Sequence, residues 1–235
     1  MLMLPSIVKK SSEGYMITTD IASELFEANV ITICDPIGPD VSQIVIQQLH
    51  LLKHKYKKIK DKKKKEQFYV TMLINSPGGS VQDGFGIVDT MRLMPYEIVT
   101  VGVGTVASMA ATIYLAGDTR LSYPNTQYLL HQPLGGTEGR ATDIEIYADN
   151  IKYIKTKLNS FIAERIGKSI EEIEKATSTG DFILYAPEAK EYGIVHAIYE
   201  PPKEKETKYA KKKLFGIEWF LQLLQFIYQN ISKTL

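Results

Sequence analysis

Three residues of the chain, Ser108, His131 and Asp181, are of the types that together carry out nucleophilic catalysis. A serine hydroxyl becomes a nucleophile when a histidine takes its proton, and a carboxylate orients that histidine. The segment between Ser108 and His131 is long enough for a helix and a returning strand, which would bring both to one edge. Taken singly, each residue has an ordinary alternative: a helix cap, a half-buried histidine and a turn aspartate.

Ser108 lies in the stretch VGVGTVASMAATIYLAG at 101–117. The stretch begins as an apolar strand, is expected to turn at Gly104, and places Ser108 where a helix of small residues begins. The first N–H groups of a helix have no intrahelical partner and carry partial positive charge. A nucleophile whose reaction generates an oxyanion benefits from that position. Serine is also a common N-cap, so a purely structural role stays open at this point.

Alternating strands and helices between residues 30 and 130 indicate an α/β fold with a mostly parallel sheet. In such folds, ligands collect at the carboxyl ends of the strands. Gly78, Gly79, Ser108 and His131 each fall just past a predicted strand end, so the sequence predicts one shared site. The predicted elements are strands at 30–34, 68–74 and 98–103, helices at 40–53 and 83–94, and a turn with a strand at 121–130.

The second half of the chain is predicted to be mainly helical. Thr142 and Glu145 form a possible capping box for a long helix over 142–166, whose heptad-like apolar stripe needs a partner helix or another subunit. Ser169 and Glu172 are suited to cap a second, shorter helix. A last helix is expected at 186–192 and a last strand at 194–198.

The composition is that of an ordinary globular protein, with 44% hydrophobic and 23% charged residues and a net charge of +1. The single cysteine, Cys34, excludes an intrachain disulfide and suits a reducing compartment. The sequence shows no secretory signal and no apolar run of 18 residues. We therefore expect a cytoplasmic protein that makes no membrane contact and binds no nucleic acid.

The charge is unevenly distributed along the chain. The run KHKYKKIKDKKKK at 53–65 holds nine lysines and one aspartate, or +8, which leaves −7 for the rest. The run contains no arginine and only one aromatic residue, which is a poor set for stacking on or reading bases. A solvated helix extension or loop is the better interpretation.

Both ends of the chain differ from its middle. Residues 1–15 are short, mixed and turn-rich, which predicts a mobile segment, and a short helix is expected at 18–26. After Pro201 and Pro202 comes a charged linker and then an amphipathic stretch at 214–231. That stretch is expected to pack on the body or on a neighbouring subunit, with a membrane interface as the alternative.

Four segments in order resemble the ClpP family, the proteolytic subunit of the ATP-dependent Clp protease. They are INSPGGSV at 74–81, GTVASMAA at 104–111, LLHQPLGGTEGRATDIEI at 129–146 and GDFILYAPEAKEYGIV at 180–195. Weaker similarity reaches back to residue 4, so the resemblance covers about residues 4–199. It implies a ClpP/crotonase-like α/β fold of repeated units, with a protruding handle helix at about 142–166.

The resemblance also implies a site and an assembly. Ser108 would be the nucleophile, His131 the base and Asp181 the orienting acid, with the amides of Gly79 and Met109 as oxyanion donors. Two stacked heptameric rings of this chain would enclose the sites, and an AAA+ unfoldase would feed them unfolded polypeptides. The chain itself would need no metal or other cofactor, because ATP is used by the unfoldase. The implied division is an N-terminal axial segment at 1–15, a peptidase domain at 16–199 and a tail at 200–235.

The chain departs from the family pattern at several positions. Gly180 stands where the family usually has an arginine that takes part in ring-to-ring contacts, and Thr71 and Leu73 replace tyrosines that help to bind unfoldase loops. Two other functions therefore stay open. One is a ClpP-like phage head-maturation protease that acts without an unfoldase, and the other is a non-catalytic ring subunit paired with an active paralogue.

Overall fold

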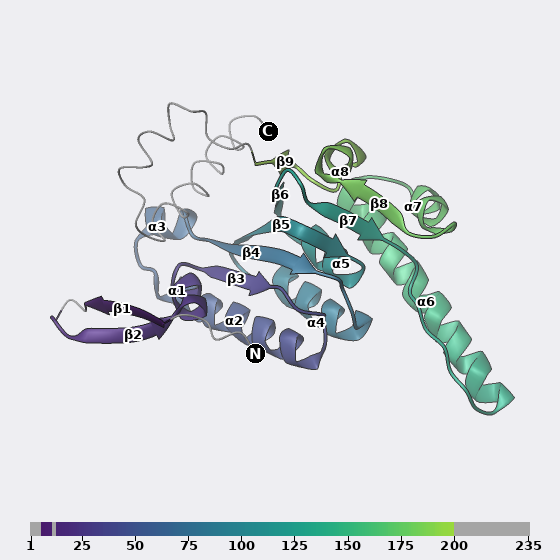
Figure 1. Cartoon of the computed structure of the whole chain (residues 1–235), viewed down its shortest axis with the longest axis horizontal. Helices are drawn as coiled ribbons and strands as arrows, with labels where there is room; N and C mark the ends of the chain where they lie inside the picture. The colour runs from purple at the N-terminus through teal and green to yellow at the C-terminus, as the bar shows by residue number, and fades with distance from the viewer. Residues whose placement is uncertain (1–5, 11–12, 200–235) are drawn as a thin grey trace.

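A computed structural model describes residues 6–10 and 13–199 (Figure 1). The strands are β1 (Ser6–Lys10), β2 (Met16–Asp20), β3 (Val30–Ile33), β4 (Tyr69–Ser76), β5 (Glu97–Ala107), β6 (Thr119–Ser122), β7 (Gln127–Leu130), β8 (Phe182–Tyr185) and β9 (Ala197–Ile198). The helices are α1 (Ile21–Glu27), α2 (Pro39–Lys58), α3 (Lys62–Glu66), α4 (Val81–Arg92), α5 (Met109–Leu115), α6 (Ala141–Ile166), α7 (Ile170–Thr177) and α8 (Ala186–Tyr192).

The central sheet is seven-stranded and mostly parallel, which confirms the predicted α/β architecture. Its main path is β3-β4-β5-β6-β9, and β7 and β8 branch from β5. The long strand β5 makes this branch possible, because its residues 99–102 pair with β6 and its residues 105–107 pair with β7. Gly104, with φ of +64°, lies between the two stretches. The predicted turn at Gly104 is therefore a bend inside one continuous strand.

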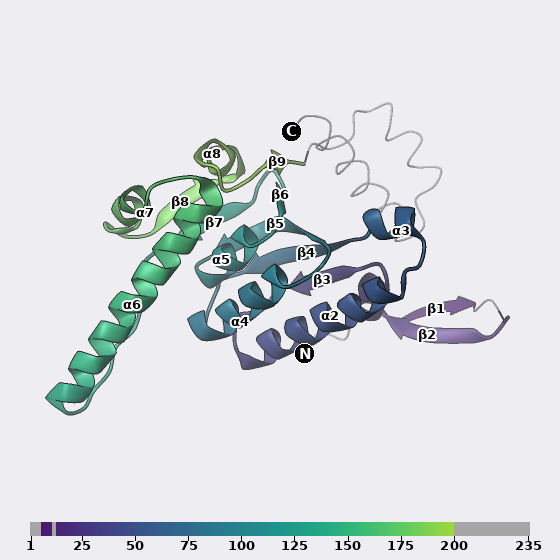
Figure 2. The same ribbon diagram turned by 180° about the vertical axis from the view of Figure 1, so that it is seen from behind.

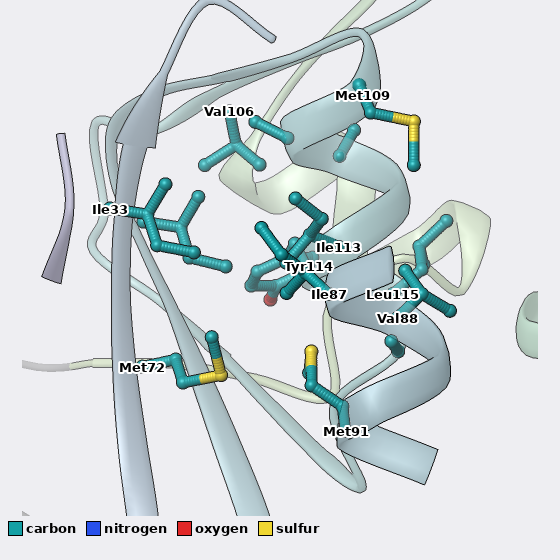
Figure 3. Close-up of a cluster of buried hydrophobic side chains, with 14 of the residues drawn as sticks. Ile33, Met72, Ile87, Val88, Met91, Val106, Met109, Ile113, Tyr114 and Leu115 are labelled. Carbon is teal, nitrogen blue, oxygen red and sulfur yellow. The ribbon is translucent and has the colours of Figure 1, made fainter. Parts of the chain in front are cut away.

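Helices α2, α4 and α5 cover one face of the sheet, as seen from behind in Figure 2. Every residue of helix α5 is buried, as expected for a helix surrounded by other elements. Its first side chain, Met109, packs so closely on α4 that a Cβ on Gly84 would lie 2.2 Å from Met109 Cγ. Figure 3 shows the resulting core, in which strand residues such as Met72 meet helix residues such as Ile87 and Tyr114. This core fixes the start of α5 against the sheet.

Helix α6 extends far beyond the body (Figures 1 and 2). It begins one residue before the predicted 142–166 helix and ends at Ile166, and the next residue, Gly167, has the φ of +72° that suits a left-handed C-cap. The predicted capping box is wrong, because Arg140 is the N-cap and no side chain caps the helix. Ser169 and Glu172 do form the capping box of α7, as predicted.

Other boundaries also differ from the prediction. Residues 6–10 were expected to be mobile and irregular, yet β1 pairs antiparallel with β2. Pairing with β1 holds Thr18 and Thr19 in β2, so the helix predicted at 18–26 begins at Ile21, where the Asp20 carboxylate accepts the Ser23 N–H. Strand β8 was not predicted, and the last strand is shorter than expected. The predicted linker and amphipathic stretch at 200–235 lie outside the described residues.

The lysine run lies in two helices joined by a short connection. Its first part continues α2 to Lys58, and Asp61 then caps α3 by accepting the Lys64 N–H. Most of its lysines are exposed, which agrees with the interpretation as a solvated helix extension. Within residues 6–10 and 13–199, no helix combines the length and the apolar character needed to cross a membrane.

Candidate active site

Ser108 lies at the junction of β5 and α5 in a strained backbone conformation. Its φ of 55° and ψ of −125° are rare for a residue with a side chain, and such strain persists only where surrounding contacts impose it. One contact is the bond from the Ser108 N–H to the Leu129 carbonyl of β7, at 2.8 Å. Ser108 is the N-cap residue of α5, but its hydroxyl makes no capping hydrogen bond. The structural alternative of a simple side-chain cap is therefore wrong.

The hydroxyl of Ser108 faces His131 instead. His131 follows directly after β7, and its Nε2 atom lies 2.7 Å from Ser108 Oγ. That distance is a normal hydrogen bond for a hydroxyl and an imidazole. The other three histidines lie elsewhere: His50 and His54 are exposed on α2, and His196 lies at the far end of the sheet, beside Arg120.

Asp181 reaches the same place through strand pairing. Strand β8 pairs antiparallel with β7, with Leu130 opposite Phe182, so the residue after β7 and the residue before β8 are neighbours. Asp181 Oδ1 lies 3.7 Å from His131 Nδ1. This distance is longer than an N–H···O hydrogen bond, and the Asp181 side chain is 56% exposed. The structure brings the three predicted residues together, with a tight Ser–His contact and a loose His–Asp contact.

Gly79 and Met109, the residues whose amides were predicted as oxyanion donors, are among the residues that line the Ser108 pocket. Gly79 forms a parallel bridge with Ile37, in which Ile37 N–H donates to the Gly78 carbonyl and Ser80 N–H donates to the Ile37 carbonyl. This pattern directs the Gly79 N–H away from Ile37. Among the described residues, neither the Gly79 nor the Met109 N–H donates to another backbone carbonyl. Both amides are therefore available to an anionic oxygen beside Ser108.

Glycines are required at 78 and 79 for space as well as for backbone angle. A Cβ on Gly78 would lie 2.6 Å from both the Ala107 carbonyl oxygen and Ser108 Cβ. A Cβ on Gly79 would lie 2.2 Å from the Ile37 carbonyl oxygen. Their φ values of +92° and +147° also lie in the region that favours glycine. The absence of a side chain at Gly78 therefore lets the turn approach Ser108, and its absence at Gly79 lets the turn pair with Ile37.

A pocket of about 240 Å³ opens beside Ser108. Most of its lining side chains are apolar, and no Asp, Glu, Lys or Arg is among the lining residues that the structure describes. The residues that line it are Gly79, Val81, Ser108, Met109, Thr112, Leu130, His131, Pro133, Leu134, Leu158 and Ile162. Sequence reasoning missed Thr112, Leu158 and Ile162. Thr112 stands one helical turn after Ser108, a spacing that could have indicated it, whereas the contributions of α6 depend on tertiary packing.

No group of three or more His, Cys, Asp or Glu side chains within the described ranges is arranged to hold a metal ion. At Ser108 the side chains of Ser108, His131 and Asp181 follow one another in the order hydroxyl, imidazole and carboxylate. A comparison with protein families agrees with this chemistry. The model of the Clp protease family matches residues 12–202, which span the central sheet, the site and α6. The chain therefore belongs to the Clp protease family, which is a family of serine-type peptidases.

Proposed function

We propose that this protein is a serine endopeptidase that hydrolyses unfolded polypeptides by way of an acyl-enzyme. The observation that carries the proposal is the 2.7 Å contact between Ser108 Oγ and His131 Nε2, made by a serine held in a strained conformation at the head of α5. A serine that merely closed a helix would bond to a backbone amide of that helix. This serine is aimed at a base.

In the acylation step, Ser108 Oγ attacks the carbonyl carbon of the scissile bond while its proton passes to His131 Nε2. For this transfer Nε2 must be unprotonated, so the imidazole carries its proton on Nδ1, toward Asp181. The tetrahedral intermediate then collapses as the C–N bond breaks, and His131 gives the proton to the leaving amine. In deacylation a water attacks the ester carbon while its proton passes to His131. The bond from that carbon to Ser108 Oγ then breaks, His131 returns the proton to Oγ, and the water oxygen ends in the new carboxyl group.

Negative charge develops on the substrate carbonyl oxygen in both steps. The N–H groups of Gly79 and Met109 are proposed to receive it, because both residues line the pocket at Ser108 and neither N–H donates to a backbone carbonyl in the described part of the chain. Loss of one such donor typically costs about 10²–10³ in kcat. The proposed chemistry uses only these groups, so the chain would need no metal or other cofactor.

Asp181 is proposed to hold the imidazolium that forms during each step. At 3.7 Å from Nδ1 its carboxylate attracts a charged ring without fixing it by a hydrogen bond. A movement of less than about 1 Å would bring the pair within hydrogen-bond distance. The proposed triad is therefore close to its working geometry in the single chain.

The proposed assembly is a homo-oligomer of two stacked heptameric rings in the cytoplasm, fed by an AAA+ unfoldase that uses ATP. Helix α6 supports the proposed ring-to-ring contact, because it projects from the body (Figure 1) and carries exposed apolar side chains. Ile146 is 65% exposed, Tyr153 is 66% exposed, and Leu134 on the preceding loop is 84% exposed. Apolar side chains gathered on one projecting element mark a surface that associates.

A single preparation tests the activity and the assembly. A fluorophosphonate probe should label the wild-type protein and the Ser178→Ala control, which replaces an exposed serine at the C-terminal end of α7, but not Ser108→Ala. Native mass of the same sample should correspond to fourteen chains. Absence of Ser108-dependent labelling in every assembly state would refute the peptidase proposal and favour the non-catalytic subunit. A single-ring or monomeric mass with normal labelling would refute only the double ring.

A further inference from the structure

Thr112 differs from the other residues of the Ser108 pocket. The walls supplied by Val81, Met109 and Leu130 are apolar, as are those supplied by α6. Apart from Ser108 and His131, Thr112 contributes the one polar side chain among the lining residues that the structure describes. It stands four residues after Ser108 on α5, so it lies one turn deeper, about 6 Å along the helix axis.

The hydroxyl of Thr112 does not bond to its own helix. Helical threonines commonly donate to the carbonyl four residues earlier. Thr90 donates to Gly86, Thr156 to Lys152 and Thr177 to Ile173, at 2.8, 3.1 and 2.9 Å. For Thr112 the corresponding carbonyl is that of Ser108, which accepts the N–H groups of Ala111 and Thr112 instead. The Thr112 hydroxyl is thus left without a partner among the described residues.

That hydroxyl is nevertheless not sealed inside the core. Within the described ranges, Tyr128 Oη is the side-chain polar atom that is fully buried and has no hydrogen-bond partner. Thr112 Oγ1 also has no partner, but it is not fully buried. Thr112 is only 2% exposed overall, and the space that it borders is the Ser108 pocket. The little surface that Thr112 retains therefore includes its oxygen, presented to that pocket.

We propose that the Thr112 hydroxyl is a specificity-determining group, which rests on the proposed peptidase function. The pocket receives the side chain of the residue whose carbonyl Ser108 attacks. Its apolar walls disfavour a charged side chain, because they offer no group that offsets the free energy lost when the charge leaves water. The hydroxyl, which can donate and accept, provides a partner for an uncharged side chain that ends in a hydrogen-bonding group. The pocket is thereby made to accept glutamine as well as an apolar side chain of the same length, methionine.

Short peptides that end in a fluorogenic amine test this proposal. The varied residue directly precedes the amine, and the amine is the leaving group, so no amino acid after the cleaved bond affects the rate. The measured quantity is the ratio of kcat/KM for glutamine to kcat/KM for methionine at that residue. Thr112→Val replaces the hydroxyl with a methyl of similar size and should lower this ratio about fivefold, the value of one ordinary net hydrogen bond. Thr112→Ser keeps the hydroxyl and should keep the ratio near that of the wild type.

Thr90→Val is the matched control, because Thr90 bonds to its own helix and does not line the pocket. A structural effect of Thr112→Val would lower both kcat/KM values together and leave their ratio unchanged. An unchanged ratio with retained Ser108-dependent turnover would overturn the role of Thr112 alone. Absence of Ser108-dependent turnover with every peptide would instead overturn the peptidase proposal on which this one rests.

Discussion

The Nδ1 atom of His131 lies 3.7 Å from Oδ1 of Asp181, whereas its Nε2 atom lies 2.7 Å from Ser108 Oγ. The two sides of one imidazole ring are thus held by contacts of different kinds. Leu129 anchors the Ser108 backbone, but Asp181 follows Gly180, whose φ is +135°, and its side chain is more than half exposed. The carboxylate is the member of the three with the most freedom to adjust.

Replacing that carboxylate should reduce turnover without preventing the fold. Asp181→Asn keeps the size of the side chain but removes the charge that stabilises an imidazolium, so kcat should fall by about 10²–10⁴-fold. Thermal unfolding should change little, because the Asp181 side chain is largely in solvent. Asp149→Asn, at an exposed position of α6, should leave kcat unaltered. A loss of less than twofold in Asp181→Asn would show that another group orients His131.

The approach of the glycine turn to the nucleophile gives a second prediction. Gly78→Ala places a Cβ 2.6 Å from backbone and side-chain atoms at Ala107 and Ser108, at a φ that alanine resists. The strand end or the turn must shift, so fluorophosphonate labelling should slow at least about tenfold and stability should fall by about 2 kcal/mol or more. Gly136→Ala is the control, because a Cβ there would meet nothing within 4 Å. Equal behaviour of the two variants would argue against a close-packed turn.

Arg165 is expected to matter for stability rather than for catalysis. Its guanidinium donates to the carbonyls of Leu115 and Gly117, both at 2.6 Å, and so satisfies the end of α5. Arg165→Gln should lower the free energy of unfolding by about 2 kcal/mol, since hydrogen bonds to charged groups are among the stronger ones. The exposed pair of Arg92 and Glu164, at 3.1 Å, provides the contrast. Arg92→Gln should cost less than about 1 kcal/mol in the same denaturant titration.

His196 should make the protein less stable in mild acid. Burial, together with the charges of Arg120 and Arg165, lowers the pKa of His196 to about 4, and its Nδ1 accepts the Arg120 N–H. The unfolded chain, with a pKa near 6.5, therefore binds the extra proton between about pH 6.5 and pH 4. This contribution to stability is present above pH 6.5 and is lost as the pH falls toward 4.

Denaturant titrations at pH 7 and pH 5 measure this effect. His196→Asn keeps an acceptor near Nδ1 but cannot be protonated, so its free energy of unfolding should fall less between the two pH values than that of the wild type. His50→Asn, at an exposed site, should keep the wild-type dependence. If His196→Asn also keeps it, another group must be responsible for the acid sensitivity.

The fold and the members of the site could be predicted because they depend on local patterns. Apolar runs ending in turns gave β3, β4 and the first half of β5, and strand ends in a parallel sheet share one edge. The order of Ser108, His131 and Asp181 then matched one family. The strained backbone of Ser108 and the distance between His131 Nδ1 and Asp181 Oδ1 could not be predicted from the sequence, because both depend on backbone placement at the ångström level.

Other parts were missed for reasons of tertiary context. Strand β8 is short and directly precedes a helix, and it exists because the edge of β7 offers it a partner. The capping box expected from Thr142 and Glu145 fails because the helix begins one residue earlier, at Ala141. The pocket wall from α6 arises where Leu158 and Ile162 reach across to α5, a contact that no local pattern encodes.

Strands β5, β7 and β8 place Ala107, Leu129 and Ile183 in one row across the sheet, and the three site residues lie one or two positions beyond that row. Successive side chains of a strand point to opposite faces, so a slip of β8 by one residue would turn Asp181 away from His131. Because Phe182 and Leu184 of β8 pack against the core, the same slip would turn both of these side chains away from it. The packing of β8 on the core therefore fixes the register on which the approach of Asp181 to His131 depends.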